Sequence, residues 1–188
     1  MLYINKKIVF ILAALLIYSC SDAERGPKEK KPDFNDEEYV IKLAQNVIGE
    51  SVSFAYAGNY SLDTNKQIVA GVEVSTADEW GIRFYHLVKN EDEFSNLFVS
   101  DLLDGSFNEC LVKKIKFPHL AYELLYYNSQ NYFLGSGSGE IISYITDYEK
   151  KKIYYAHLFF ERDRAVSLFL SENIDSEDIR NFFMSVFK

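Results

Sequence analysis

Three histidines carry the most versatile chemistry in this 188-residue chain, because imidazole binds metals and transfers protons near neutral pH. His86, His119 and His157 are widely spaced, and neither a His-Glu-x-x-His motif nor a paired-cysteine zinc spacing occurs. His86 and His157 fall in stretches rich in Phe, Tyr and Leu. We therefore expect core or strand-edge histidines and predict neither a metal site nor a cofactor. A cluster formed by histidines from separate strands stays open as the alternative.

Cys110 is the one candidate nucleophile in the body of the chain. Its surroundings, Glu109-Cys110-Leu111-Val112, match no nucleophile motif, and a lone thiol is more often buried than catalytic. With only Cys20 as a second cysteine, no disulfide framework is available. We predict a non-catalytic protein and keep a hydrolase using Cys110 or a histidine cluster as the alternative.

Binding is the function that the remaining residues favour. The run 135–139 resembles a phosphate loop, but no Lys follows it and it leads into a strand-like segment, which indicates a flexible loop. Trp80 lies at a predicted turn, and eight tyrosines occur within residues 122–155, where exposed rings would anchor a protein or a glycan. The predicted contact surface consists of Trp80, Gly135, Ser136, Gly137, Ser138, Gly139 and Tyr144.

The first twenty residues have the pattern of an export signal. Lys6 and Lys7 precede an apolar run over 8–17 that is too short to span a bilayer, and a small residue stands directly before Cys20. The ending Ile-Tyr-Ser-Cys resembles a bacterial lipobox, which implies cleavage after residue 19 and acylation of Cys20. We predict a lipoprotein signal peptide over 1–19; an ordinary signal peptide and a buried helix are the alternatives.

A charged segment follows the lipidation site. Residues 21–33 contain no large apolar side chain, so we predict that 20–34 comprise the lipidated cysteine and a tether. Asp22 and Glu24 resemble the export signal of surface lipoproteins in Bacteroidota. The expected location is therefore the bacterial cell envelope, at the outer membrane, either periplasmic or surface-exposed.

Net charge excludes one class of partner. The chain has a formal charge of −8, and an acidic protein lacks the Lys and Arg surplus that nucleic-acid phosphates require. Cleavage would remove Lys6 and Lys7, two of the 20 cations beside 28 anions, and leave −10. Such a body is repelled by anionic lipids, so membrane attachment must come from the acyl chains.

Residues 35–188 predict one globular α+β domain. Capping residues and apolar spacing predict helices over 36–48, from Asn90 to about residue 102, and from Asp175 to the end. Alternating side chains predict strands over 51–56, 67–75, 81–88, 109–116, 119–127, 140–147, 152–160 and 165–171. The last two would form a hairpin that pairs Phe159 with Val166. The expected fold class is a mainly antiparallel sheet with about three helices packed on it.

This order of elements resembles the PsbP-like fold. The matching segments are 52–56 with 59–63, then 117–124, then 154–170 with the closing helix. The resemblance implies an α/β/α sandwich and a non-catalytic accessory or docking protein. The leading function is therefore an envelope lipoprotein that binds a protein or glycan partner. An immunity or inhibitor lipoprotein that neutralises an envelope-acting toxin is the alternative, because an acidic domain is steered towards a basic target.

Overall fold

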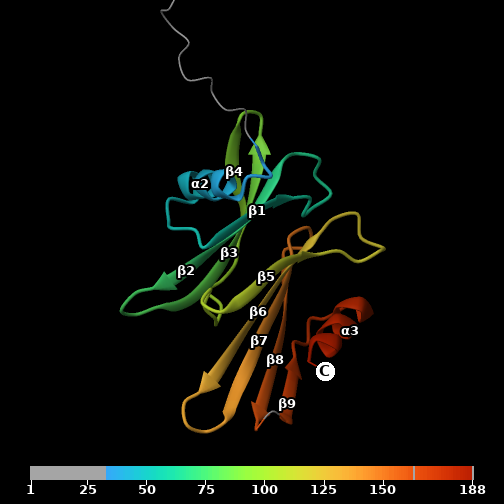
Figure 1. Ribbon diagram of the computed structural model, residues 1–188. Helices are drawn as coiled ribbons and strands as arrows, with labels where there is room; N and C mark the ends of the chain where they lie inside the picture. Colours follow the sequence, from blue (N-terminus) through green and yellow to red (C-terminus); the bar gives the residue numbers. More distant parts are fainter. Residues whose placement is uncertain (1–32, 163, 188) are drawn as a thin grey trace, which may run out of the picture. The chain divides into compact units, whose positions relative to one another are not determined.

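The computed structural model describes residues 33–162 and 164–187 of the chain. The predicted signal peptide, the lipidation site at Cys20 and the tether up to residue 32 lie outside the described residues. Asp33–Lys188 form one compact unit. The elements, labelled as in Figure 1, are α2 (Glu37–Ile48), β1 (Phe54–Gly58), β2 (Gln67–Ser75), β3 (Trp80–Asn90), β4 (Glu93–Val99), β5 (Cys110–Ile115), β6 (Leu124–Phe133), β7 (Ser138–Asp147), β8 (Lys152–Glu161), β9 (Arg164–Leu170) and α3 (Glu177–Val186).

Two antiparallel sheets make up most of this unit. The first has the strand order β1-β2-β3-β4 and the second the order β5-β6-β7-β8-β9, so within each sheet consecutive strands pair with each other. The predicted α+β class with mainly antiparallel strands is confirmed. The described residues contain two helices rather than about three, and the strands are divided between two sheets.

Local sequence explains both ends of α2. The Asp36 carboxylate accepts the N–H of Tyr39 at 3.2 Å and caps the first turn. Gly49 closes the helix with φ 81°, a left-handed conformation that glycine adopts without a Cβ penalty. The predicted helix over 36–48 is confirmed. Neither described helix has the length and apolarity that crossing a membrane requires.

The helix predicted from Asn90 is wrong, because this segment is a β-hairpin. Asn90 pairs with Glu93 across a tight turn in which Glu91 has φ 53°, and the chain continues as β4. A register shift opposite His86 and Leu87 sends the two phenylalanines of β4 to different cores: Phe94 packs on Phe34, and Phe98 on Tyr148. Their spacing of four residues fits a helical stripe equally well, so local pattern alone could not distinguish the two structures.

Three apolar cores hold the unit together. One lies between α2 and the first sheet and includes Val40, Ala44 and Leu87. The second joins the two sheets and is largely aromatic, with Phe84 of the first sheet beside Tyr127 and Tyr144 of the second. The third lies between α3 and the second sheet. Its members include Tyr126, Tyr154, Ile179 and Phe183.

The terminal helix begins one residue later than predicted. Ser176 is its N-cap, while the Asp175 carboxylate binds Lys152 Nζ at 2.7 Å and the Tyr154 hydroxyl at 3.1 Å. The bond from Lys152 is the main reason why the pKa of Asp175 is lowered. Ile174 and Ile179 are both buried in the third core, as the predicted apolar staple requires.

Candidate functional site

The structure divides the predicted contact residues between exposed and buried positions. Trp80 is 55% exposed at the start of β3. Gly135, Ser136 and Gly137 form the exposed turn between β6 and β7, with positive φ at both glycines. The Ser136 hydroxyl donates to the Phe133 carbonyl at 3.0 Å, so this turn is held by its own hydrogen bonds.

Three of the predicted contact residues are structural. Tyr144 is 4% exposed and donates its hydroxyl to the Asp104 carbonyl at 3.0 Å, so its assignment to the surface is wrong. Ser138 and Gly139 belong to β7, and Gly139 is buried. A Cβ at Gly139 would lie 2.4 Å from both the Asn131 carbonyl oxygen and the Phe160 ring, so this glycine permits close packing.

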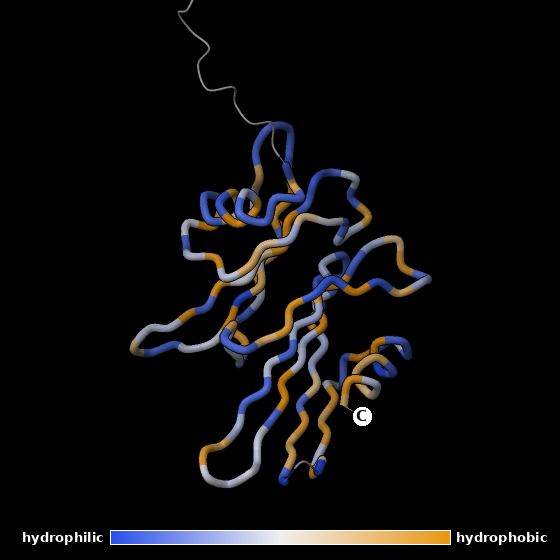
Figure 2. Tube along the Cα trace, viewed as in Figure 1, coloured by the Kyte–Doolittle hydropathy of each residue, from blue (hydrophilic) through white to orange (hydrophobic). Residues whose placement is uncertain are grey.

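Trp80 and the turn at 135–137 do not belong to one element. Trp80 lies in the β2–β3 hairpin of the first sheet, whereas the turn joins two strands of the second sheet. The turn has an apolar neighbourhood, since Leu134 and Phe133 beside it are both exposed. Figure 2 shows apolar residues at this turn and along β8 and β9.

An aromatic surface lies on the second sheet where these strands extend beyond the core. The register places Glu140 opposite Phe159 and His157 opposite Phe169, so these side chains share one face. Phe159 and Phe169 are 39% and 56% exposed. We call this set the aromatic surface: Phe133, Glu140, Tyr155, His157, Phe159 and Phe169.

A polar pair lies in the middle of the aromatic surface. His157 Nε2 lies 2.8 Å from Glu140 Oε2, and both side chains are largely buried, at 16% and 20% exposure. Asn131 Nδ2 donates to the other Glu140 oxygen at 3.3 Å. The Phe159 ring lies over the imidazole with 4.1 Å between ring centroids. The carboxylate and the ring fix the orientation of His157, so a polar partner group would meet a preorganised site.

The aromatic surface contains part of what a hydrolase requires. A histidine oriented by a carboxylate has the arrangement of a general base, but catalysis by a nucleophile needs that nucleophile within hydrogen-bond reach. On the sheet, Cys110 lies opposite Ser129, Ser129 opposite Ile142, and Ile142 opposite His157, so three strand spacings separate the thiol from the imidazole. At about 4.8 Å per spacing, the two groups are far out of contact.

Cys110 itself is in surroundings that lower its reactivity. Burial raises the pKa of its thiol, and its Sγ donates to the Phe107 carbonyl at 3.5 Å. The thiolate is the reactive species, and apolar burial disfavours it.

The three histidines have separate partners. His157 pairs with Glu140, His119 Nδ1 lies 2.9 Å from an oxygen of Asp178, and His86 Nε2 lies 3.1 Å from Gln67 Oε1. Within 33–162 and 164–187, no group of three His, Cys, Asp or Glu side chains is arranged to hold a metal ion.

The buried surroundings of His86 hold several polar atoms without partners. Among the described residues, His86 Nδ1 and the hydroxyls of Tyr60 and Tyr148 make no hydrogen bond. Both tyrosine rings lie against the imidazole, with ring centroids 6.5 and 5.0 Å away. Burial lowers the pKa of His86 to about 4, so this side chain is neutral at physiological pH.

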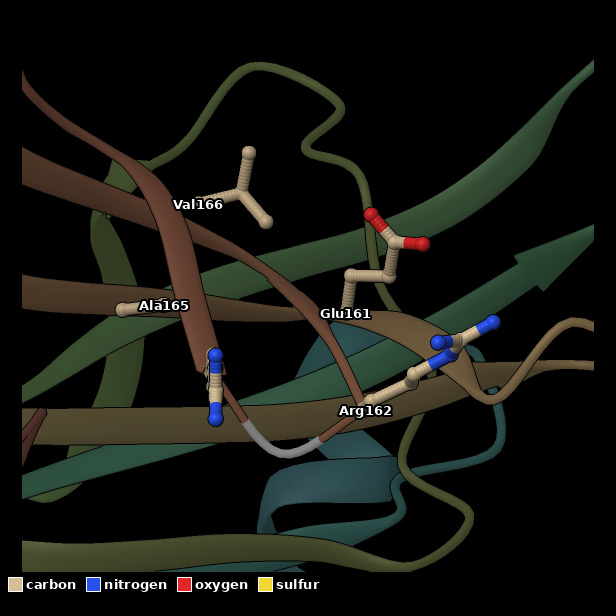
Figure 3. A pocket seen from close by; sticks show the side chains of 5 residues that line it. Glu161, Arg162, Ala165 and Val166 are labelled. Atoms are coloured by element: carbon tan, nitrogen blue, oxygen red, sulfur yellow. The ribbon is translucent and has the colours of Figure 1, made fainter.

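A shallow hollow lies at the turn between β8 and β9. Glu161, Arg162, Arg164, Ala165 and Val166 line it (Figure 3). Residue 163 belongs to this turn and lies outside the described residues, so no site is assigned here.

The aromatic surface was missed by the sequence analysis, although the sequence carries a signal for it. β8 contains Phe159 and Phe160 in succession, and β9 contains Leu168 and Phe169. Successive side chains of a strand point to opposite faces of the sheet. When two successive residues are large and apolar, either both faces are covered or one of the two side chains is exposed.

Comparison with known proteins identified no relative of this chain. The chain matches no protein-family model, no curated protein and no solved structure.

Proposed function

We propose that this chain is a lipoprotein of the bacterial cell envelope, anchored through Cys20, that acts without catalysis by binding a partner protein through the aromatic surface. One observation carries this proposal: three partly exposed phenylalanines surround the oriented Glu140–His157 pair on an uncovered part of a sheet. Contiguous apolar exposure around a few polar groups is typical of interaction sites.

The composition of the surface favours a protein partner over a glycan. Its exposed rings are Phe133, Phe159 and Phe169, which have no polar edge, and Leu134 extends the apolar area. Aromatic anchors around a buried polar pair are typical of protein interface centres. Binding a sugar would need several free donors and acceptors, whereas Glu140 is already bonded by both Asn131 and His157.

The predicted lipid anchor at Cys20 agrees with a binding role. A signal peptide, a lipidated cysteine and a charged tether would hold the domain near a membrane without burying it. The PsbP-like α/β/α sandwich is retained as part of the proposal on sequence resemblance alone. The accessory or docking role that it implies agrees with a binding function.

Neutralisation of an envelope-acting toxin is the second candidate function. The net charge of −8 favours it, because an acidic body accelerates encounter with a basic target. It predicts an association rate that falls steeply as salt concentration rises, whereas binding dominated by the phenylalanines would depend little on salt.

The test is co-purification from the native membrane. Full-length protein carrying Phe159→Ser together with Phe169→Ser is compared with wild type and with Leu62→Ser, which changes a 64% exposed residue between β1 and β2. We expect wild type and Leu62→Ser to retain the same partner and the double variant to lose it. Phe159 and Phe169 are partly exposed at the end of the sheet, so we expect the double variant to remain folded, and urea unfolding beside wild type and Leu62→Ser checks this.

Two results would refute the proposal. Equal recovery of the partner by a folded double variant would exclude the aromatic surface. Recovery of carbohydrate with no stoichiometric protein would exclude a protein partner.

A further inference from the structure

The Glu140 carboxylate has no permanently charged basic partner. Its side chain is 20% exposed, and among the described residues it forms a salt bridge with His157 but with no lysine or arginine. Imidazole carries a positive charge only while it is protonated. Burial of an ionised carboxylate is costly unless charges and hydrogen bonds compensate it. The aromatic surface therefore holds a carboxylate that a cationic group of a partner would stabilise.

Glu140 also has unused capacity to accept hydrogen bonds. A carboxylate has about four lone-pair positions, two on each oxygen. Asn131 Nδ2 takes one position on the first oxygen at 3.3 Å, and His157 Nε2 takes one on the second at 2.8 Å. One position on each oxygen remains, as a guanidinium that donates two parallel N–H groups requires. Glu140 can therefore bind an arginine in addition to its two internal partners.

The rings around Glu140 have no cation above them. Elsewhere in this chain a lysine covers an aromatic ring: Lys66 Nζ lies 4.0 Å from the centroid of Phe34. Within 33–162 and 164–187, no Lys or Arg lies over a ring of the aromatic surface. Phe159 is directly opposite Glu140 in the sheet and is 39% exposed. A cation bonded to Glu140 would lie beside this ring, whose face attracts positive charge.

A second carboxylate adds negative charge to the same surface. Burial raises the pKa of the Tyr155 hydroxyl, and the charges of Asp104 and Glu140 raise it further. Asp104, like Glu140, forms no salt bridge with a lysine or arginine in the part of the chain that the structure describes. Arg164 of β9 lies opposite another carboxylate, that of Glu161. The charge at the centre of the aromatic surface is thus complementary to a basic group.

We propose that the partner protein inserts an arginine side chain into the aromatic surface, where its guanidinium bonds to both oxygens of Glu140 and packs on the Phe159 ring. Arginine fits this site better than lysine, because a planar guanidinium both stacks on aromatic rings and donates two N–H groups to one carboxylate. Arginine is also enriched among the residues that dominate binding at protein interfaces. The inference rests on the proposed binding function and specifies the chemistry of the partner.

Ligand-observed NMR tests the site with defined probes. The probes are N-acetyl-arginine amide and N-acetyl-citrulline amide, which has nearly the same shape but no charge. Saturation transfer from full-length protein in lipid nanodiscs to each probe is titrated for wild type, Glu140→Gln and Glu93→Gln. Glu140→Gln removes the charge but retains polar groups for Asn131 and His157. Glu93→Gln is the matched control, because it removes one charge from an exposed position on β4 of the first sheet.

We expect wild type and Glu93→Gln to bind the arginine probe at least about tenfold more tightly than the citrulline probe, because a hydrogen bond to a charged group is worth that factor. Glu140→Gln should lose this preference. Equal or undetectable binding of the two probes by wild type would overturn the inference. An undiminished preference in Glu140→Gln would also overturn it.

Recovery of the partner from the native membrane separates this inference from the proposed function. Glu140→Gln should lose the partner, as Phe159→Ser with Phe169→Ser does, whereas Glu93→Gln should retain it. If Glu140→Gln retains a partner that the double phenylalanine variant loses, the aromatic surface binds without an arginine and this inference alone fails. Retention of the partner by the double variant would refute the proposed function itself.

Discussion

Because His86 is buried, the free energy of unfolding of this protein should depend on pH. The side chain is fully buried on β3, and Gln67 Oε1 accepts hydrogen bonds from both His86 and the Tyr60 N–H. Because an amide oxygen only accepts, the imidazole must carry its proton on Nε2. Protonation of Nδ1 would place a positive charge at an atom that has no partner among the described residues.

The size of the effect follows from the pKa of His86. Burial is the main cause that lowers it from 6.5 to about 4; Lys151 lowers it further and Asp63 acts in the opposite direction. In the unfolded chain His86 takes up a proton near pH 6.5, whereas the folded protein resists protonation until about pH 4. The contribution of neutral His86 to the free energy of unfolding is therefore complete above pH 6.5 and is lost as the pH falls to about 4. The loss amounts to about 3 kcal/mol of unfolding free energy.

Urea unfolding at pH 7.5 and pH 4.5 measures this loss. Carboxylates also titrate in this range, so wild type is compared with His86→Gln, which retains a donor for Gln67 but does not titrate. Tyr60→Phe is the matched control, since it changes the same buried cluster and leaves His86 in place. We expect wild type and Tyr60→Phe to lose about 2–3 kcal/mol more than His86→Gln on acidification. The same pH dependence in all three proteins would refute the reasoning.

Three further predictions concern single side chains. Tyr127→Phe should cost about 1–2 kcal/mol, because its hydroxyl donates to the Ser106 carbonyl at 2.6 Å and accepts the Ser106 N–H at 3.0 Å; urea unfolding would contradict this if stability were unchanged. Cys110 should react with iodoacetamide at least about tenfold more slowly in the folded protein than in urea, and equal rates would exclude its burial. Cys20→Ala should abolish incorporation of a palmitate label, and undiminished labelling would place the lipid elsewhere.

Elements fixed by nearby residues were predictable from the sequence. The helix over 36–48 has its own cap, apolar stripe and terminal glycine, and the closing helix has an apolar staple; both occur within two residues of the expected start. Such signals lie within one or two turns and need no information about the rest of the chain.

Features decided by distant contacts were not predictable. The segment from Asn90 has helical spacing, but β3 supplies a pairing partner that holds it as β4. The β8–β9 hairpin was predicted one residue out of register: Phe159 pairs with Ser167, not Val166, because the pairing is irregular beside Phe160. A single extra residue in a strand reverses the faces of the residues beyond it, and no local rule fixes where it occurs.

The same limit applies to the candidate site. Trp80 and the turn at 135–137 are exposed, as turn chemistry predicts, whereas Tyr144 is buried because the first sheet covers its part of the second sheet. Which tyrosines and phenylalanines are covered depends on where the first sheet ends, and this is decided by the packing of two sheets that are formed by different halves of the chain.

Photo-crosslinking in intact cells tests the central claim most directly. A benzoylphenylalanine at position 169 is compared with one at position 62, which is also exposed, at 64% against 56%, but lies in the loop that joins β1 and β2. The account predicts one discrete cross-linked protein at position 169 that disappears when Phe159 is changed to Ser, and no such product at position 62. The same product from both positions, or none from position 169, would contradict it.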